Sequence, residues 1–185
     1  MSTVVNIGGS QTSNVPWVKE LILVPKSKVI STVDPAFEVN ENQYLVFPGY
    51  LVLAADAKLV KIDFAPRTCT WSERVADTMG VRGYLSVFGW EFSKNNGSLT
   101  SWLLDTRQQE FIAIWTDRNG EVYVTGTSEV GLELSYDRVI SNRNMVAVNL
   151  TGIIDQPTYN VSATDLNAFM EEVEFSEEYS IEFYS

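Results

Sequence analysis

The sequence predicts a mainly β protein, a β-sandwich or small barrel, with one or two short helices. Between residues 111 and 151, four runs alternate apolar with polar or small side chains or are rich in β-branched and aromatic residues. A period of two is typical of strands with one buried face. Turn signals recur about every 8–12 residues, a spacing typical of sandwiches and barrels. The composition, 45% apolar and 12% aromatic, predicts a folded core.

The clearest local signal is a hairpin formed by residues 111–116 and 121–125. Asp117, Arg118, Asn119 and Gly120 separate the two runs. Asn and Gly tolerate the positive φ angles that tight hairpin turns need. The sequence therefore predicts an exposed turn at these four residues.

The other strands are predicted in order along the chain, after a polar segment of residues 1–15 that is typical of a flexible arm. Proline and glycine residues separate the strand-like runs that follow. The predicted strands cover residues 18–24, 28–32, 43–47, 50–53, 59–64, 68–75, 83–92, 132–136 and 145–151.

Two helices are expected, at residues 98–105 and 162–173. In the second, Leu166, Phe169, Met170 and Val173 repeat at helical spacing, and a serine or threonine at the start can cap the first turn. This apolar stripe either packs on the sheet of its own domain or docks on a neighbouring subunit. The sequence leaves both possibilities open.

Beyond the second helix, glutamates alternate with aromatic residues, among them Phe175, Tyr179 and Phe183. Such an extension is suited to adding a strand to a partner or to its own sheet. The predicted organisation is a flexible arm at 1–15, a β-domain at 16–160, and a helix with an acidic extension at 161–185.

The residue inventory argues against catalysis. The chain has no histidine, and Cys69 is its only cysteine, which removes the usual nucleophile pairs and most transition-metal sites. We therefore expect no enzyme activity, cofactor or metal. Paired carboxylates are the remaining catalytic option, and the candidates are better explained as solvated positions on strands. The candidates are Asp117, Glu121, Glu129, Glu133 and Asp137.

The net charge of −11 is concentrated at the end of the chain, since residues 144–185 contain no lysine or arginine. Such a segment repels nucleic acid and anionic membranes, so a basic binding groove is not expected. There is no apolar run long enough to span a membrane and no secretion signal at the start. We expect synthesis and assembly in a cytoplasm.

Five tryptophans leave a second functional class open, a carbohydrate-binding β-sandwich module, because exposed aromatic rings stack on sugars. The tryptophans are Trp17, Trp71, Trp90, Trp102 and Trp115. Most lie within apolar or alternating runs, where core packing is the simpler explanation.

Over roughly residues 60–155, the order of hairpins and turns resembles structural proteins of tailed bacteriophages, especially small tail-tube, tail-completion and neck-ring proteins. The segments that carry the likeness are 71–74, 83–84, 88–95, 111–120, 125–126, 131–132, 142–144 and 150–152.

The resemblance implies a virion protein of the tail or neck. Its subunits would associate side by side into a homo-oligomeric ring or tube, a hexamer or dodecamer. Other tail, neck or portal proteins would be its partners, and DNA would pass through the lumen without specific binding. Its acidic character fits such a passage, because like charge prevents DNA adhesion. The expected subunit contacts are Asp117, Arg118, Asn119, Gly120, Leu166, Phe169, Met170, Phe175, Tyr179 and Phe183.

Overall fold

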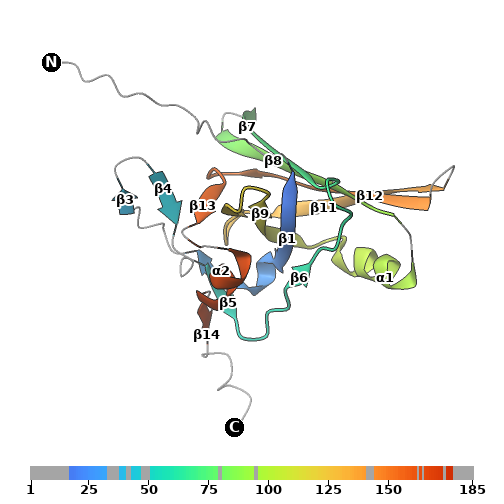
Figure 1. Ribbon diagram of the computed structural model, residues 1–185, viewed down its shortest axis with the longest axis horizontal. Helices are drawn as coiled ribbons and strands as arrows, with labels where there is room; N and C mark the ends of the chain where they lie inside the picture. The colour runs from blue at the N-terminus through green and yellow to red at the C-terminus, as the bar shows by residue number, and fades with distance from the viewer. Residues whose placement is uncertain are drawn as a thin grey trace, which may run out of the picture.

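The structure is a computed structural model that describes residues 17–32, 38–40, 43–46, 51–78, 81–93, 96–140, 144–161, 163, 165–172 and 174–176. These residues form strands in two sheets, two short α-helices and one 3-10 turn (Figure 1). The prediction of a mainly β protein with two short helices is confirmed. The predicted arm at residues 1–15 lies outside the described residues.

The larger sheet follows one path of nine strands, to which two further strands are added. In order across the sheet, the nine are β3 (Glu38–Asn40), β4 (Gln43–Val46), β13 (Tyr159–Val161), β10 (Val122–Thr125), β9 (Glu110–Asp117), β11 (Leu132–Ile140), β12 (Asn144–Ile154), β8 (Val81–Phe92) and β7 (Thr70–Thr78). β1 (Val18–Pro25) pairs with β9 along its length and also with β6 (Val60–Lys61). The pairs are antiparallel except β4 with β13.

The smaller sheet has the strand order β14–β5–β2. Its strands are β14 (Glu174–Ser176), β5 (Leu51–Ala54) and β2 (Val29–Thr32). β5 pairs in parallel with β14 and antiparallel with β2. The 3-10 turn Lys26–Lys28 connects β1 to β2 and so links the two sheets.

β9 lies at the centre of the fold and is buried on both faces. Phe111, Ala113 and Trp115 belong to a first core, together with apolar residues of β1, β8, β11 and β12. Ile112 and Ile114 belong to a second core, with residues of β5, β10 and the second helix. Burial on two faces explains why this strand is continuously apolar and does not alternate.

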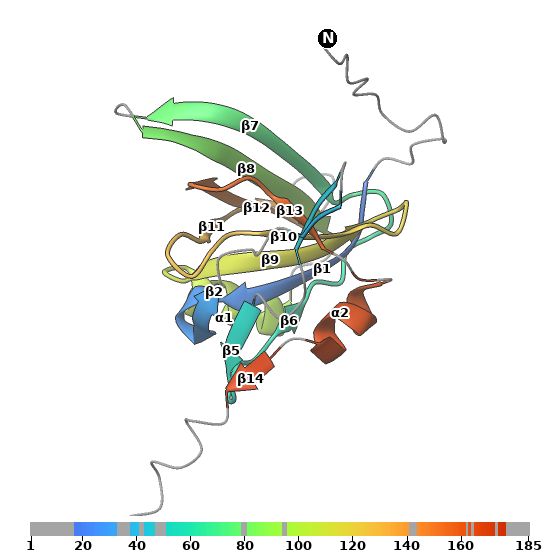
Figure 2. The same cartoon turned by 90° about the vertical axis from the view of Figure 1, so that its left-hand side faces the viewer.

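The larger sheet curls so that β7 and β8 pack over β9 and β10 (Figure 2). The ring centroids of Trp71 on β7 and Trp115 on β9 lie 4.7 Å apart across this core. The curl does not close into a barrel, because β7 pairs only with β8 among the described strands. At the open side, the Val18 amide donates one backbone hydrogen bond to the Cys69 carbonyl, at 3.2 Å. Of the two predicted architectures, the layered one describes this fold.

Each helix begins at a side-chain cap. In α1 (Gly97–Thr106), the Asn96 side chain accepts a hydrogen bond from the Leu99 amide at 2.8 Å. In α2 (Leu166–Glu172), Asp165 accepts one from the Ala168 amide at 2.9 Å. α2 therefore begins at Leu166, after the predicted start at residue 162, because Asp165 provides the cap.

Candidate functional site

Hydrogen bonds among its own polar groups close the predicted contact turn. The Asp117 carboxylate accepts hydrogen bonds from the amides of Asn119 and Glu121, at 2.9 and 3.0 Å, and from the Asn119 side-chain amide at 2.8 Å. Gly120 has a φ of +95°, which a residue with a Cβ rarely adopts. Asn119 and Gly120 are exposed at the tip of the turn, and Arg118, which is half-buried, carries the positive charge among the four residues.

The apolar stripe of α2 packs into the second core of its own chain. Leu166 is 2% exposed and Phe169 is fully buried, next to Ile112 and Ile114 of β9, and Met170 is half-buried against the same core. This burial leaves little surface of Leu166 and Phe169 for a neighbouring subunit. A role of these residues in subunit contacts stays a prediction.

The acidic extension begins as a strand of the smaller sheet. Phe175 lies in the middle of β14, in register with Leu53 of β5. Tyr179 and Phe183 lie outside the described residues. The extension therefore adds a strand to a sheet of its own chain at Glu174–Ser176, one of the arrangements that the sequence left open.

An aromatic cluster joins the two layers of the larger sheet. Tyr123 of β10 stacks on Trp115 of β9 at 4.3 Å between ring centroids, and Trp71 of β7 lies 6.5 Å from Tyr123. Partial burial, together with the nearby charges of Asp117 and Glu121, raises the pKa of Tyr123 to about 12. The phenol therefore stays neutral at physiological pH.

A chain of hydrogen bonds continues from this cluster to the edge of the sheet. The Trp115 indole donates to the Thr125 hydroxyl at 3.1 Å, and this hydroxyl lies 2.9 Å from that of Thr158. Thr158 donates both its hydroxyl and its amide to the Glu73 carboxylate, at 2.6 and 2.9 Å. Glu73 lies on β7, so the chain connects β9, β10 and the segment before β13 to the edge strand.

β7 gives the curled sheet a long edge. Its nine residues pair on one side with β8, and within the described part of the chain no strand pairs with its other side. Val75, near the end of this strand, is an exposed apolar side chain (56%). An unpaired strand edge of this length is a template for another strand. Sequence reasoning identified the strand but not its position at an edge, because strand order depends on pairings between distant residues.

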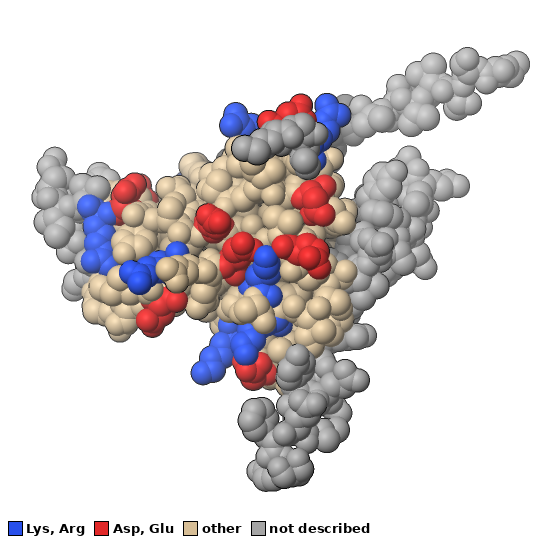
Figure 3. All heavy atoms as spheres, turned by 180° about the vertical axis from the view of Figure 1, so that it is seen from behind, with Lys and Arg blue, Asp and Glu red and all other residues tan. Residues whose placement is uncertain are grey.

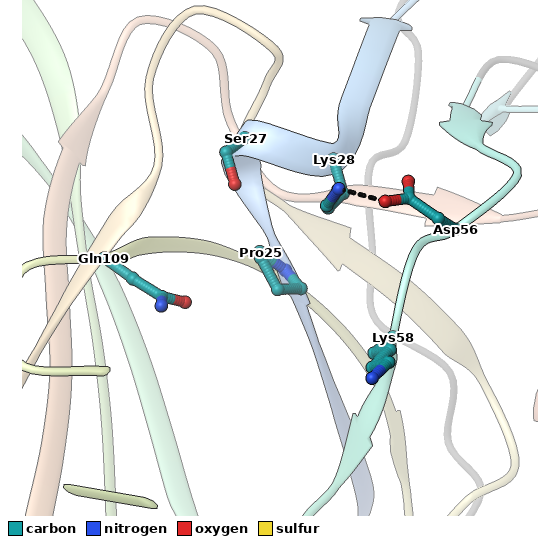
Figure 4. Close-up of a pocket in the computed structure, with 6 residues that line it drawn as sticks. All are labelled: Pro25, Ser27, Lys28, Asp56, Lys58 and Gln109. Atoms are coloured by element: carbon teal, nitrogen blue, oxygen red, sulfur yellow. Dashed lines mark hydrogen bonds and ion pairs between the residues drawn. The ribbon is translucent and has the colours of Figure 1, made fainter. Parts of the chain in front are cut away.

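A shallow pocket of about 360 Å³ lies between the two sheets, where the 3-10 turn meets the turn after β5 (Figure 4). We call it the lysine pocket, and its lining residues are Pro25, Ser27, Lys28, Asp56, Lys58 and Gln109. Lys28 donates a hydrogen bond to the Asp56 carboxylate, and this bond lowers the pKa of Asp56.

A second ion pair lies close to the lysine pocket. Lys26 pairs with Glu110 and also donates to the Glu129 carbonyl at 2.9 Å. The hydrogen bond from Lys26 lowers the pKa of Glu110, whose carboxylate also accepts from the Gly131 amide. The Lys26 amine therefore makes its polar contacts with residues of its own chain.

The described surface carries charges of both signs. Figure 3 shows lysine and arginine side chains intermingled with aspartates and glutamates on one face of the molecule. This face therefore lacks the continuous basic stripe that is typical of nucleic-acid-binding surfaces. Separately, no helix in the described residues has the length and apolar character needed to cross a membrane.

The titratable groups do not form a recognisable catalytic arrangement in the described part of the chain. Burial raises the pKa of Cys69 to about 12, so its thiol is protonated and inert at neutral pH. Among the described residues, no group of three or more acids and cysteines is placed to hold a metal ion. The groups that could engage a ligand are thus the β7 edge, the hairpin tip at 117–120 and the lysine pocket.

Comparison with known proteins finds no matching protein family, no matching curated protein and no matching solved structure.

Proposed function

We propose that this protein is a structural virion protein that assembles into a homo-oligomeric ring or tube in the tail or neck of a phage, around the passage for DNA. The observation that carries assembly is the β7 edge. Nine residues of strand, paired on one side only among the described strands, offer a row of backbone donors and acceptors to another chain.

The ends of the larger sheet are suited to a head-to-tail contact. Its nine-strand path ends at β7 on one side and at β3 on the other, so the two edges belong to different strands. A contact between two different surfaces of the same chain is heterologous, and repeating it generates a ring or a helical tube. A symmetric dimer would instead use one surface twice.

The charge supports a channel through which DNA passes without binding. The chain has a net charge of −11, and its last 42 residues (185 − 143) contain no base. Acidic walls repel phosphates, so the duplex is not held. The assignment to a phage tail or neck rests on the resemblance of residues 60–155 to tail and neck proteins.

The alternative, a carbohydrate-binding module, requires tryptophan faces open to solvent. Trp90 and Trp115 are 2% and 3% exposed, and Trp71 and Trp102 pack against the first core. Trp17 is the one tryptophan with substantial exposure, at 39%. A single exposed ring is a poor platform for stacking on a sugar chain, so the assembly function is the better supported of the two.

The proposal is tested by changing one exposed residue on the β7 edge. Val75→Lys places a charge on this strand, a substitution that blocks edge pairing. Ile30→Lys is the matched control, because Ile30 is an exposed apolar residue (43%) on β2 of the smaller sheet.

Sedimentation velocity of the wild type and both variants measures the outcome. We expect oligomers for the wild type and for Ile30→Lys, and a shift to monomer for Val75→Lys with an unchanged melting temperature. Equal oligomer formation by all three proteins would exclude the β7 edge as the contact. A wild type that stays monomeric at every concentration would contradict self-assembly.

A further inference from the structure

The lysine pocket contains one cation without a partner in the described part of the chain. Lys28 is paired with Asp56, and the neighbouring Lys26 is paired with Glu110. No ion pair among the described residues involves Lys58, although Lys58 is close enough to Asp56 to lower the pKa of that carboxyl. Figure 4 shows the Lys28 amine directed at Asp56, and Lys58 further along the segment that carries Asp56. The pocket can therefore accept additional negative charge at Lys58.

The end of β14 lies at the same end of the smaller sheet as this pocket. β14 runs parallel to β5, and Ser176 is in register with Ala54, the last residue of β5. Asp56 and Lys58 follow Ala54 along the chain. On the other side of β5, Leu53 is in register with Val29, the residue directly after Lys28. Ser176, the last described residue before the acidic segment, consequently lies beside the start of the turn that carries Asp56 and Lys58.

The segment after Ser176 has the complementary charge. Residues 177–182 include Glu177, Glu178 and Glu182 and contain no lysine or arginine. A residue spans at most about 3.3–3.6 Å, so the first glutamates after β14 have only a short distance to cover before reaching the turn at 55–58. The charge and the reach of residues 177–182 therefore both favour this segment as the occupant of the lysine pocket.

We propose that the lysine pocket is a binding site for an acidic peptide and that residues 177–182 of the same chain occupy it, with a glutamate paired to Lys58. Occupation by the same chain is favoured because the segment is tethered at Ser176, which is in register with Ala54, and tethering raises its effective concentration at its own pocket. A neighbouring copy would have to displace it. This inference does not depend on the proposed ring, since the contact forms within one chain.

The test is zero-length crosslinking with a water-soluble carbodiimide, which joins carboxylates to lysine amines in direct contact. Full-length protein is prepared unlabelled and ¹⁵N-labelled, mixed in equal amounts, crosslinked, digested with chymotrypsin and analysed by mass spectrometry. Chymotrypsin is used because residues 144–185 contain no site for trypsin. The ion pairs Lys28–Asp56 and Lys61–Glu20 serve as internal positive controls.

We expect a crosslink from Lys58 to Glu177, Glu178 or Glu182 within chains of one isotope. Its yield should fall severalfold in 1 M salt, where the Debye length is about 3 Å. Lys58→Gln should remove it, and Lys19→Gln, at an exposed lysine on β1, should leave it unchanged.

Three results would overturn the inference. The first is a crosslink found mainly between the two isotopes, which assigns the pocket to a neighbouring copy. The second is a Lys58 that links only to Asp56 while both control pairs are joined. The third is equal linking of the acidic segment to Lys19 and Lys58, which denotes random collision.

Discussion

The Thr158 hydroxyl donates a 2.6 Å hydrogen bond to the carboxylate of Glu73, a residue 85 positions earlier in the chain. The Thr158 amide donates to the same oxygen at 2.9 Å. This contact fastens the edge strand β7 to the segment before β13, where no ladder of backbone hydrogen bonds holds the curled sheet together. This carboxylate therefore adds a polar contact to the packing of Trp71 on Trp115 in holding β7 over the rest of the sheet.

Replacing this carboxylate should destabilise the fold. Glu73→Ala leaves the partly buried Thr158 hydroxyl and amide without their acceptor, and we expect a loss of about 1–3 kcal/mol in the free energy of unfolding. Glu133→Ala, at an exposed glutamate on β11, is the control and should change stability by less than about 0.5 kcal/mol. Urea denaturation followed by circular dichroism measures both. Equal stability of the two variants would show that the contact does not hold the sheet.

Two glycines with open surroundings allow the strain of the hairpin turn to be measured. A Cβ at either Gly120 or Gly97 would meet nothing within 4 Å, but only Gly120 has a positive φ, of +95°. Gly120→Ala should therefore cost about 1–2 kcal/mol from backbone strain alone. Gly97→Ala, in the first turn of α1, should be neutral or stabilising by up to about 1 kcal/mol. A neutral Gly120→Ala would contradict the turn geometry.

The central aromatic residue should contribute more to stability than any exposed one. Trp115 is 3% exposed, stacks on Tyr123 and donates its indole hydrogen bond to Thr125. Trp115→Ala should cost about 3–5 kcal/mol through the cavity and the lost contacts. Trp17→Ala, at a tryptophan that is 39% exposed, should cost far less. Thermal unfolding is followed by circular dichroism, because removing a tryptophan changes the fluorescence signal. Similar melting temperatures of Trp115→Ala and Trp17→Ala would contradict this prediction.

Stability should decline at alkaline pH, because two groups have a pKa of about 12 in the folded chain. Burial raises the pKa of Cys69 from 9.0, and burial with nearby acids raises that of Tyr123 from 10.0. A raised pKa means that the unfolded chain loses these protons first. The stabilisation is therefore complete below about pH 9 and is lost progressively as the pH rises towards 12.

Urea denaturation between pH 8 and pH 11 measures this loss, and Cys69→Ala should reduce it. At pH 8 the native Cys69 thiol should also fail to react with a thiol reagent until urea unfolds the protein. Rapid labelling of the native chain would contradict the burial of Cys69.

Local sequence signals identified most of the strands and the turn between β9 and β10. Asn119 and Gly120 marked this turn correctly, because the conformational tolerance of these residues is a local property. The short strands β3 and β13 have three residues each, too few to show a periodic pattern, and were not predicted. For the acidic extension an added strand was expected without exact bounds, and β14 forms at its start. Of the predicted strand at 59–64, the structure forms only Val60–Lys61, the two residues in register with β1.

The candidate sites depend on arrangements that local patterns do not contain. Glu73 and Thr158 meet only when β7 curls over the sheet, and Lys28 and Asp56 meet only through the pairing of β2 with β5. The stripe of α2 was recognised from its spacing, but its burial against β9 required the fold. The position of β7 at an edge of the sheet likewise depends on the strand order, which local patterns do not contain.

Electron microscopy of the purified full-length protein tests the central claim most directly, since it gives the shape and the copy number of particles together. Assembly through the β7 edge, with the copy numbers that the resemblance implies, predicts annular particles of six or twelve copies, or stacked tubes, with a mass that is the matching multiple of 20.8 kDa. Uniform 20.8 kDa monomers at all concentrations and salt conditions would contradict it.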